Sequence, residues 1–200
     1  MNYLKNGFLL LLLSASFLFA SCLKDGDETI CLVVPNGALP ADLVDADLLA
    51  EIAGLMPVYD GANPPVVDGE YLVSPVELLH ASDGYSNNFY DMTFSFDNQN
   101  GRGLLRYGET QGTATGSGSE AHIIGSGDGF TIFSQMEQTN PEGGYSCRMV
   151  VVLSGKKTEQ GIADLHYAFV MCDREGETSA LVDNNVFRIF RDGDGYSEKL

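Results

Sequence analysis

The feature that most constrains the fold is a series of short segments in which apolar and polar residues alternate. The clearest of these places four apolar side chains at every second position: Tyr90, Met92, Phe94 and Phe96. A period of two puts successive side chains on opposite faces of a strand, so the pattern predicts a strand with one buried face. Seven further segments read as strands: residues 69–80, 104–110, 120–124, 130–137, 145–154, 163–172 and 186–191.

The connections between these segments are rich in Gly, Asn and Asp and contain no helical pattern. Asn98-Gln99-Asn100-Gly101 includes the Asn-Gly pair of a tight hairpin. Residues 108–118 and 125–129 are Gly-rich but precede no helix, so turns are predicted rather than phosphate-binding loops, and residues 116–119 are predicted to form a flexible polar loop.

Consecutive antiparallel strands of this kind predict an all-β fold, an eight-stranded meander that closes as a barrel, with a two-sheet sandwich as the alternative. The interior of an eight-stranded barrel is either filled by side chains or holds one small ligand. If there is a cavity, the candidates to line it are Tyr90, Met92, Phe94 and Phe96.

One helix is predicted ahead of the strands. It begins at Pro40-Ala41-Asp42, ends at Pro57, and carries apolar residues at near-helical spacing: Val44, Leu48, Ile52 and Leu55. An extended connector, residues 58–67, follows. The predicted organisation is a signal peptide (1–21), a tether (22–40), the helix and connector (41–67) and the β domain (68–200).

The first residues have the pattern of a secretory signal. Lys5 precedes an apolar run from Phe8 to Ala20, which at about 13 residues is shorter than the roughly 20 that a membrane-spanning helix needs. The run ends in Leu18-Phe19-Ala20-Ser21-Cys22, which resembles the lipobox of bacterial lipoproteins. That resemblance implies cleavage before Cys22 and acylation of this cysteine, palmitate included. The alternative is an ordinary cleaved signal followed by a cysteine.

The segment after Cys22, Leu23-Lys24-Asp25-Gly26-Asp27-Glu28, resembles the charged export signal of surface lipoproteins of the Bacteroidetes type. The resemblance implies a lipid-anchored protein at the outer surface of the outer membrane, with a periplasm-facing anchor as the alternative. The partners that we expect are the membrane, through the lipid, and a small ligand or a surface protein or glycan.

Charge excludes one class of partner. The chain has 28 acidic and 11 basic residues, a formal net charge of −17. Nucleic-acid binding depends on Lys and Arg neutralising phosphates, so we expect no nucleic-acid partner.

The start of the β domain resembles the calycin family. Gly69-Glu70-Tyr71 resembles the Gly-x-Trp pattern of the first calycin strand, with Tyr in place of Trp, and Arg188 and Arg191 stand near the end of the chain. The resemblance implies a barrel in which this first-strand aromatic packs against a basic residue of the final strand.

Besides Cys22, the chain contains Cys31, Cys147 and Cys172. If Ser154 pairs with Leu165 in a hairpin, Cys147 lies opposite Cys172, within reach of a disulfide. The alternatives are two buried thiols, or Cys31 paired with one of them. No Cys-x-x-Cys motif or Cys/His cluster is present, so neither a metal site nor a cofactor is predicted.

No catalytic motif stands out. His80, His122 and His166 fall on separate predicted strands, and no nucleophile elbow precedes a helix. We therefore expect a non-catalytic, membrane-anchored lipoprotein whose β domain binds a small ligand or a surface partner. The alternatives are an assembly module with a filled interior and a polymer or glycan hydrolase.

Overall fold

A computed structural model describes residues 20–25, 28–33 and 46–200 of the chain. The helix α1 (Ala46–Leu55) precedes most of the strands, and the predicted helix start at residues 40–42 lies outside the described residues. A hairpin of β1 (Ala20–Asp25) and β2 (Glu28–Val33) forms a two-stranded sheet of its own. Among the described residues, no helix is long and apolar enough to span a membrane.

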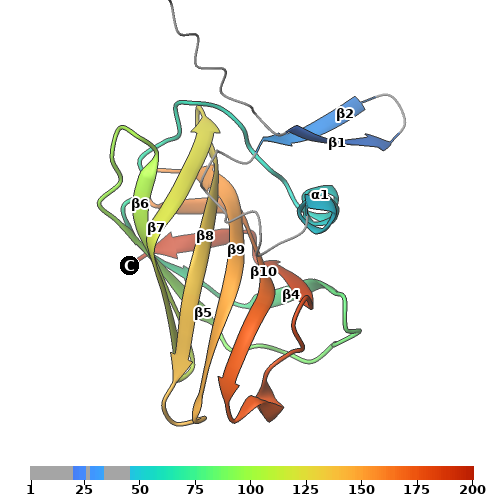
Figure 1. The fold of residues 1–200 in the computed structure, drawn as a ribbon. Coiled ribbons are helices and arrows are strands. Elements are labelled where there is room, and N and C mark those ends of the chain that lie inside the picture. The colour runs from blue at the N-terminus through green and yellow to red at the C-terminus, as the bar shows by residue number, and fades with distance from the viewer. Residues whose placement is uncertain (1–19, 26–27, 34–45) are drawn as a thin grey trace, which may run out of the picture.

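One antiparallel sheet makes up the rest of the fold (Figure 1). Its strands are β3 (Gly69–Val73), β4 (Val76–Ala81), β5 (Met92–Asp97), β6 (Leu104–Gln111), β7 (Ala114–Ser126), β8 (Gly129–Asn140), β9 (Tyr145–Lys157), β10 (Gly161–Gly176), β11 (Phe187–Asp192) and β12 (Tyr196–Lys199). A 3-10 helix, η1 (Thr178–Ala180), lies between β10 and β11.

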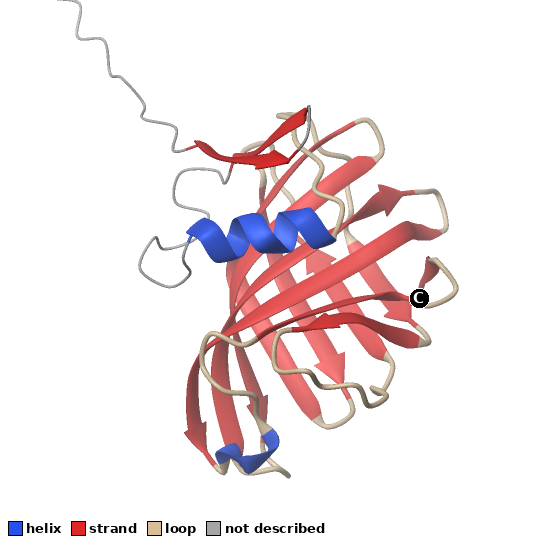
Figure 2. Ribbon diagram, turned by 90° about the vertical axis from the view of Figure 1, so that its right-hand side faces the viewer, coloured by secondary structure: helices blue, strands red, loops and turns tan. Residues whose placement is uncertain are grey.

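The last strand turns this sheet into a barrel-like ring. β12 pairs with β3, where Lys199 lies opposite Tyr71, and also with β10, where Glu198 lies opposite Gly161. The pairings therefore run through eight strands, in the order β3-β5-β6-β7-β8-β9-β10-β12 and back to β3. This confirms the predicted antiparallel all-β fold. β10 continues past β12 to pair with β11, and β11 pairs with β4, so these two strands extend from the ring. Figure 2 shows the helix α1, in blue, lying across the outside of the sheet.

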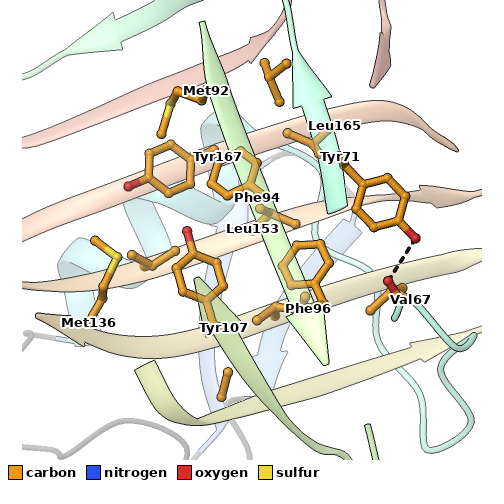
Figure 3. Close-up of a cluster of buried hydrophobic side chains, with 14 of the residues drawn as sticks. Val67, Tyr71, Met92, Phe94, Phe96, Tyr107, Met136, Leu153, Leu165 and Tyr167 are labelled. Atoms are coloured by element: carbon orange, nitrogen blue, oxygen red, sulfur yellow. Dashed lines mark hydrogen bonds between the residues drawn. The ribbon is translucent and has the colours of Figure 1, made fainter. Parts of the chain in front are cut away.

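The inner core fills most of the barrel. The alternation on β5 buries Phe94 and Phe96, which contact rings from β6 and β10 (Figure 3). Phe94 lies 5.1 Å from Tyr167 and 6.1 Å from Tyr107, measured between ring centroids. Such aromatic pairs add to the stabilisation that burial alone provides.

A second core lies outside the ring, beneath α1. Leu49, Ile52 and Met56 face the outer surface of strands β8 to β11. The side chains that they cover include Phe133, Val150, Val152, Val170, Phe187 and Ile189. Because both faces of β9 are buried, its residues from Met149 to Leu153 are all apolar instead of alternating.

The connector after α1 closes one end of the barrel. Tyr59 and Thr131 exchange hydrogen bonds of 2.8 and 3.0 Å, and Ala62 forms a bridge to Gly125. Val67 is fully buried, and its carbonyl accepts a 2.8 Å hydrogen bond from the Tyr71 hydroxyl. The segment predicted to be only a connector therefore supplies part of the core.

The structure corrects three predicted elements. Residues 69–80 form two strands, β3 and β4, which lie in different parts of the sheet. Residues 116–119 belong to β7 instead of a flexible loop. β12 follows a turn at residues 192–195, where no strand was predicted.

The basic residues near the first-strand aromatic are also different from those expected. Lys157 and Lys199 lie over the Tyr71 ring, 5.7 and 5.9 Å from its centroid. Arg188 and Arg191 instead lie on β11, where they pair with Asp83 and Glu77. The place that the calycin resemblance gave to an arginine is thus held by lysines.

Candidate functional site

A pocket of about 140 Å³ lies at the end of the barrel opposite Val67. The turns that connect β6 to β7 and β8 to β9 are at this end. Its apolar lining comes from the barrel wall and two loops: Phe89, Met92, Phe169, Leu181, Val182 and Phe190. Polar side chains enter it from β6, β8 and β10: Glu109, Gln138 and Tyr167. An apolar cavity with a few convergent polar groups is the usual form of a small-molecule site.

Glu109 is the most unusual residue of this pocket. Alternation along β6 buries Leu105, Tyr107 and Glu109 on the inner face, so the carboxyl points into the barrel with only 4% of the residue exposed. The Tyr107 hydroxyl donates a 2.6 Å hydrogen bond to Glu109 Oε2, and Gln138 Nε2 donates a 3.1 Å bond to Oε1. Tyr167 also hydrogen-bonds the carboxyl.

Burial controls the charge of this carboxyl. Loss of solvation raises the pKa of Glu109 to about 7, although the hydrogen bonds from Tyr107, Tyr167 and Gln138 lower it. Burial raises the pKa of both tyrosines well above their usual value, so both hydroxyls keep their protons and act as donors. Within the described part of the chain, Glu109 forms no ion pair. The site therefore holds a carboxyl that changes charge near neutral pH.

Two neighbours position the Glu109 side chain. A Cβ atom on Gly116 would lie 3.0 Å from Glu109 Cγ and 2.5 Å from the Met136 sulfur, so glycine leaves the space that both side chains occupy. The Cys147 thiol donates to Gln138 Oε1 at 3.8 Å, which turns the amide nitrogen of Gln138 toward Glu109. Burial, and then the charge of Glu109, raises the pKa of Cys147 to about 11, so this thiol stays protonated.

The segment of residues 82–91, between β4 and β5, covers one side of the pocket. Arg188 Nη2 lies 2.7 Å from Asp83 Oδ2, and the Arg188 guanidinium lies 4.0 Å from the centroid of the Tyr85 ring. Phe89 meets Phe190 edge to face, with 4.7 Å between centroids. These contacts hold the segment against β11.

The four residues predicted to line a cavity lie in different parts of the structure. Met92 lines the pocket, whereas Phe94 and Phe96 belong to the packed core. Tyr90 precedes β5 and is 78% exposed, so its prediction as a lining residue is wrong. The alternation that includes Tyr90 in the sequence starts in the structure only at Met92.

The predicted disulfide is not present. Cys147 lies opposite Arg174, and Cys147 and Cys172 both remain thiols. Ser154 pairs with His166 instead of Leu165, and a register shift between Met171 and Asp173 moves Cys172 out of the regular pairing. The backbone of Cys22, the predicted lipidation site, pairs with that of Cys31 in the β1–β2 hairpin. Acylation of Cys22 stays a prediction.

The residues at the centre of the site were missed at the level of sequence. Glu109 falls in the predicted strand 104–110 at the same parity as Leu105 and Tyr107, so strict alternation places it on the buried face. A carboxylate at an inward position of a barrel strand is the signal that could have identified it. Tyr167 has no comparable signal, because β10 is apolar on both faces from Tyr167 to Met171.

No family model, curated protein or solved structure matches this chain.

Proposed function

We propose that this protein is a membrane-anchored lipoprotein whose barrel binds a small ligand in the pocket around Glu109. One observation carries the proposal: a buried carboxyl that forms no ion pair with any described residue faces an apolar cavity at one end of the barrel. Burying an ionisable group is costly, and such groups concentrate at functional sites.

Size limits the ligand. The pocket is close to the roughly 150 Å³ of an engineered cavity that accepts benzene, and below the 300–1,000 Å³ typical of drug-sized ligands. We therefore propose a ligand built on a single ring or a short chain, with a polar group that meets Glu109. It would enter between the 82–91 segment and the loop that carries Leu181.

Ligand-observed NMR with single-ring fragments tests this proposal. A tryptophan in place of Leu181, at the mouth, would fill the opening without changing the barrel strands, whereas Val66→Trp at an exposed position is the matched control. We expect saturation-transfer signals with the wild-type chain and with V66W, and their loss with L181W. Equal signals from L181W, or none from the wild type, would contradict binding in this pocket.

The anchoring part of the proposal rests on the lipobox at Leu18–Cys22. With the charged segment after Cys22, it supports an anchor at the outer membrane that faces the cell surface, and a periplasm-facing anchor is the alternative. Cys22→Ala should abolish acylation and move the protein from the membrane fraction to the soluble fraction. Continued membrane association of the C22A variant would contradict lipid anchoring.

A second candidate function is that of an assembly module. A groove of about 490 Å³ lies along β4, the outermost strand of the sheet, and its lining includes Leu79 and Tyr85. An edge strand can bind an extended segment of another protein. Glycoside cleavage is the less favoured alternative, since it ordinarily requires two carboxyls and the barrel pocket is lined by one, Glu109.

A further inference from the structure

We infer that the barrel pocket selects a small organic cation, a protonated amine on a single ring, whose ammonium group pairs with Glu109. This inference rests on the proposed function and names the ligand class of the same site. Three features of the pocket carry it: the hydrogen bonds of the carboxyl, its missing countercharge and the aromatic lining.

The carboxyl has room for one more donor. An ionised carboxylate offers about four acceptor positions. Tyr107 donates to Oε2 and Gln138 to Oε1, and the Tyr167 hydroxyl also interacts with the carboxyl. A ligand that donates a hydrogen bond completes the set. A ligand that only accepts would leave the ionised carboxyl desolvated and meet its negative charge.

The charge balance favours a cation. Arg188 is the one basic residue that lines the pocket, and its guanidinium is engaged by Asp83 at 2.7 Å and by the Tyr85 ring. Asp83 thus neutralises the positive charge on this side, while Glu109 stays without a cationic partner among the described residues. A buried carboxylate is stabilised most by an opposite charge that is also hydrogen-bonded to it.

The walls suit an ammonium group on a ring. Four aromatic rings line the pocket: Phe89, Tyr167, Phe169 and Phe190. The centroids of the first three lie 4.7, 5.9 and 6.0 Å from that of Phe190. Aromatic faces attract cations, and the same rings pack against the apolar part of a ligand. The lining thus combines a negative end with an apolar wall.

The pH dependence of binding provides a second test, because protonation of Glu109 removes the negative charge. The groups that face Glu109 are Tyr107, Tyr167 and the Cys147 thiol, and none of them titrates near neutrality. The charged group on the other side of the pocket is Arg188, which is paired with Asp83. Affinity for an amine should therefore fall below pH 7 as Glu109 takes up a proton, by about tenfold for each pH unit at the steepest. Affinity for a neutral ligand should not follow this course.

Isothermal titration of the full chain in detergent micelles, with a micelle-only blank, tests the inference. The probes are benzylamine, benzyl alcohol and benzoate, which share one ring and differ in charge. We expect benzylamine to bind about tenfold or more tighter than benzyl alcohol at pH 8, and benzoate to bind weakest. Glu109→Gln should remove this preference. Glu70→Gln, at an exposed position of β3, is the matched control that should keep it.

The outcomes separate the inference from the proposed function. Binding of benzyl alcohol as tight as that of benzylamine, or tighter binding of benzoate, would overturn the cation selectivity while leaving a small-ligand site. Absence of binding by all three probes would overturn both. If E109Q does not fold, the wild-type comparison at pH 8 and pH 5.5 decides the question, because only charge pairing gives the loss of benzylamine binding in acid.

Discussion

Glu109 lowers the stability of the fold that holds it. Its pKa rises from 4.5 to about 7 on burial, so the folded state keeps this proton to a higher pH than the unfolded chain does. The free energy of unfolding should therefore fall as pH rises from about 4.5 to about 7, by roughly 3 kcal/mol from this residue, and then level off.

Urea denaturation at pH 5 and pH 8 measures this difference, and Glu109→Gln should make the pH dependence shallower. Some dependence should remain in the variant. Burial also raises the pKa of Asp192, from 3.8 to about 6, and this residue acts in the same direction. Identical slopes in wild type and E109Q would show that Glu109 is ionised in the folded protein throughout this range.

Gly116 provides the space for the Glu109 side chain, and an alanine there should be costly. Its Cβ would lie 2.5 Å from the Met136 sulfur. Overpacking of this kind typically costs about 1–3 kcal/mol, measurable by chemical denaturation. Gly54→Ala in α1, where no atom lies within 4 Å of the added carbon, is the control, and it should leave stability unchanged or raise it by up to about 1 kcal/mol. Equal effects at the two positions would exclude the steric explanation.

The position of Glu109 could be predicted from the sequence, but its contacts could not. Alternation along residues 104–110 places Glu109 on the inner face of the barrel, but it does not show that Tyr167 and Gln138 meet it there. Those contacts join β6 to β8 and β10, and they depend on the strand order. Tyr90 illustrates the opposite error, since it keeps the alternation of β5 but lies outside the strand.

Among the elements, α1 contributes to stability through one face. Ile52 is 1% exposed against the outer surface of the sheet, whereas Leu55 is 44% exposed. Ile52→Ala should lower the free energy of unfolding by about 2–4 kcal/mol, and Leu55→Ala by less than about 1 kcal/mol. Thermal or chemical unfolding measures both. A similar loss at the two positions would mean that α1 does not pack as described.

The 82–91 segment should open when its ion pair is removed. The Arg188–Asp83 pair is partly buried, with side-chain exposures of 10% and 27%, and the hydrogen bond from Arg188 holds the pKa of Asp83 below its usual value. Asp83→Asn should increase amide hydrogen exchange of residues 84–90 by about tenfold or more.

The control for this segment is Asp97→Asn, because the Arg106–Asp97 pair is exposed at the surface and such pairs contribute little. Its exchange pattern in residues 84–90 should match the wild type. Unchanged exchange in D83N would show that the aromatic contacts of Tyr85 and Phe89 hold the segment without the ion pair.

Element boundaries show where sequence patterns fail. Gly116 and Gly118 suggest a loop by composition, but close approach to Met136 and Ser134 requires them to be glycine within β7. β12 has four residues and shows little alternation, so its strand conformation comes from pairing with β3 and β10. Tertiary pairing overrides local propensity in both cases.

For the molecule as a whole, alternation predicted the all-β architecture, whereas the preference for a barrel over a sandwich rested on the calycin resemblance of Gly69-Glu70-Tyr71. The ring closes through β12, a strand that the sequence pattern did not predict. Deletion of residues 196–200 should expose the edges of β3 and β10 and lower the Tm by more than about 10 °C, with self-association visible in size-exclusion chromatography. Removal of Leu200 alone, which takes away one backbone hydrogen bond to Glu70 of β3 but leaves β12 in place, is the control, and its effect on the Tm should be much smaller.

The pairing of β12 with β3 also sets an order of events in time. Tyr71 and Lys199, partners across this seam, are separated by 128 residues of chain. A protein that emerges from a ribosome or an export channel in order, amino end first, cannot complete the ring until both strands are out. Until β12 has emerged, β3 and β10 each lack one pairing partner, and unpaired strand edges of this kind are prone to pair with other chains.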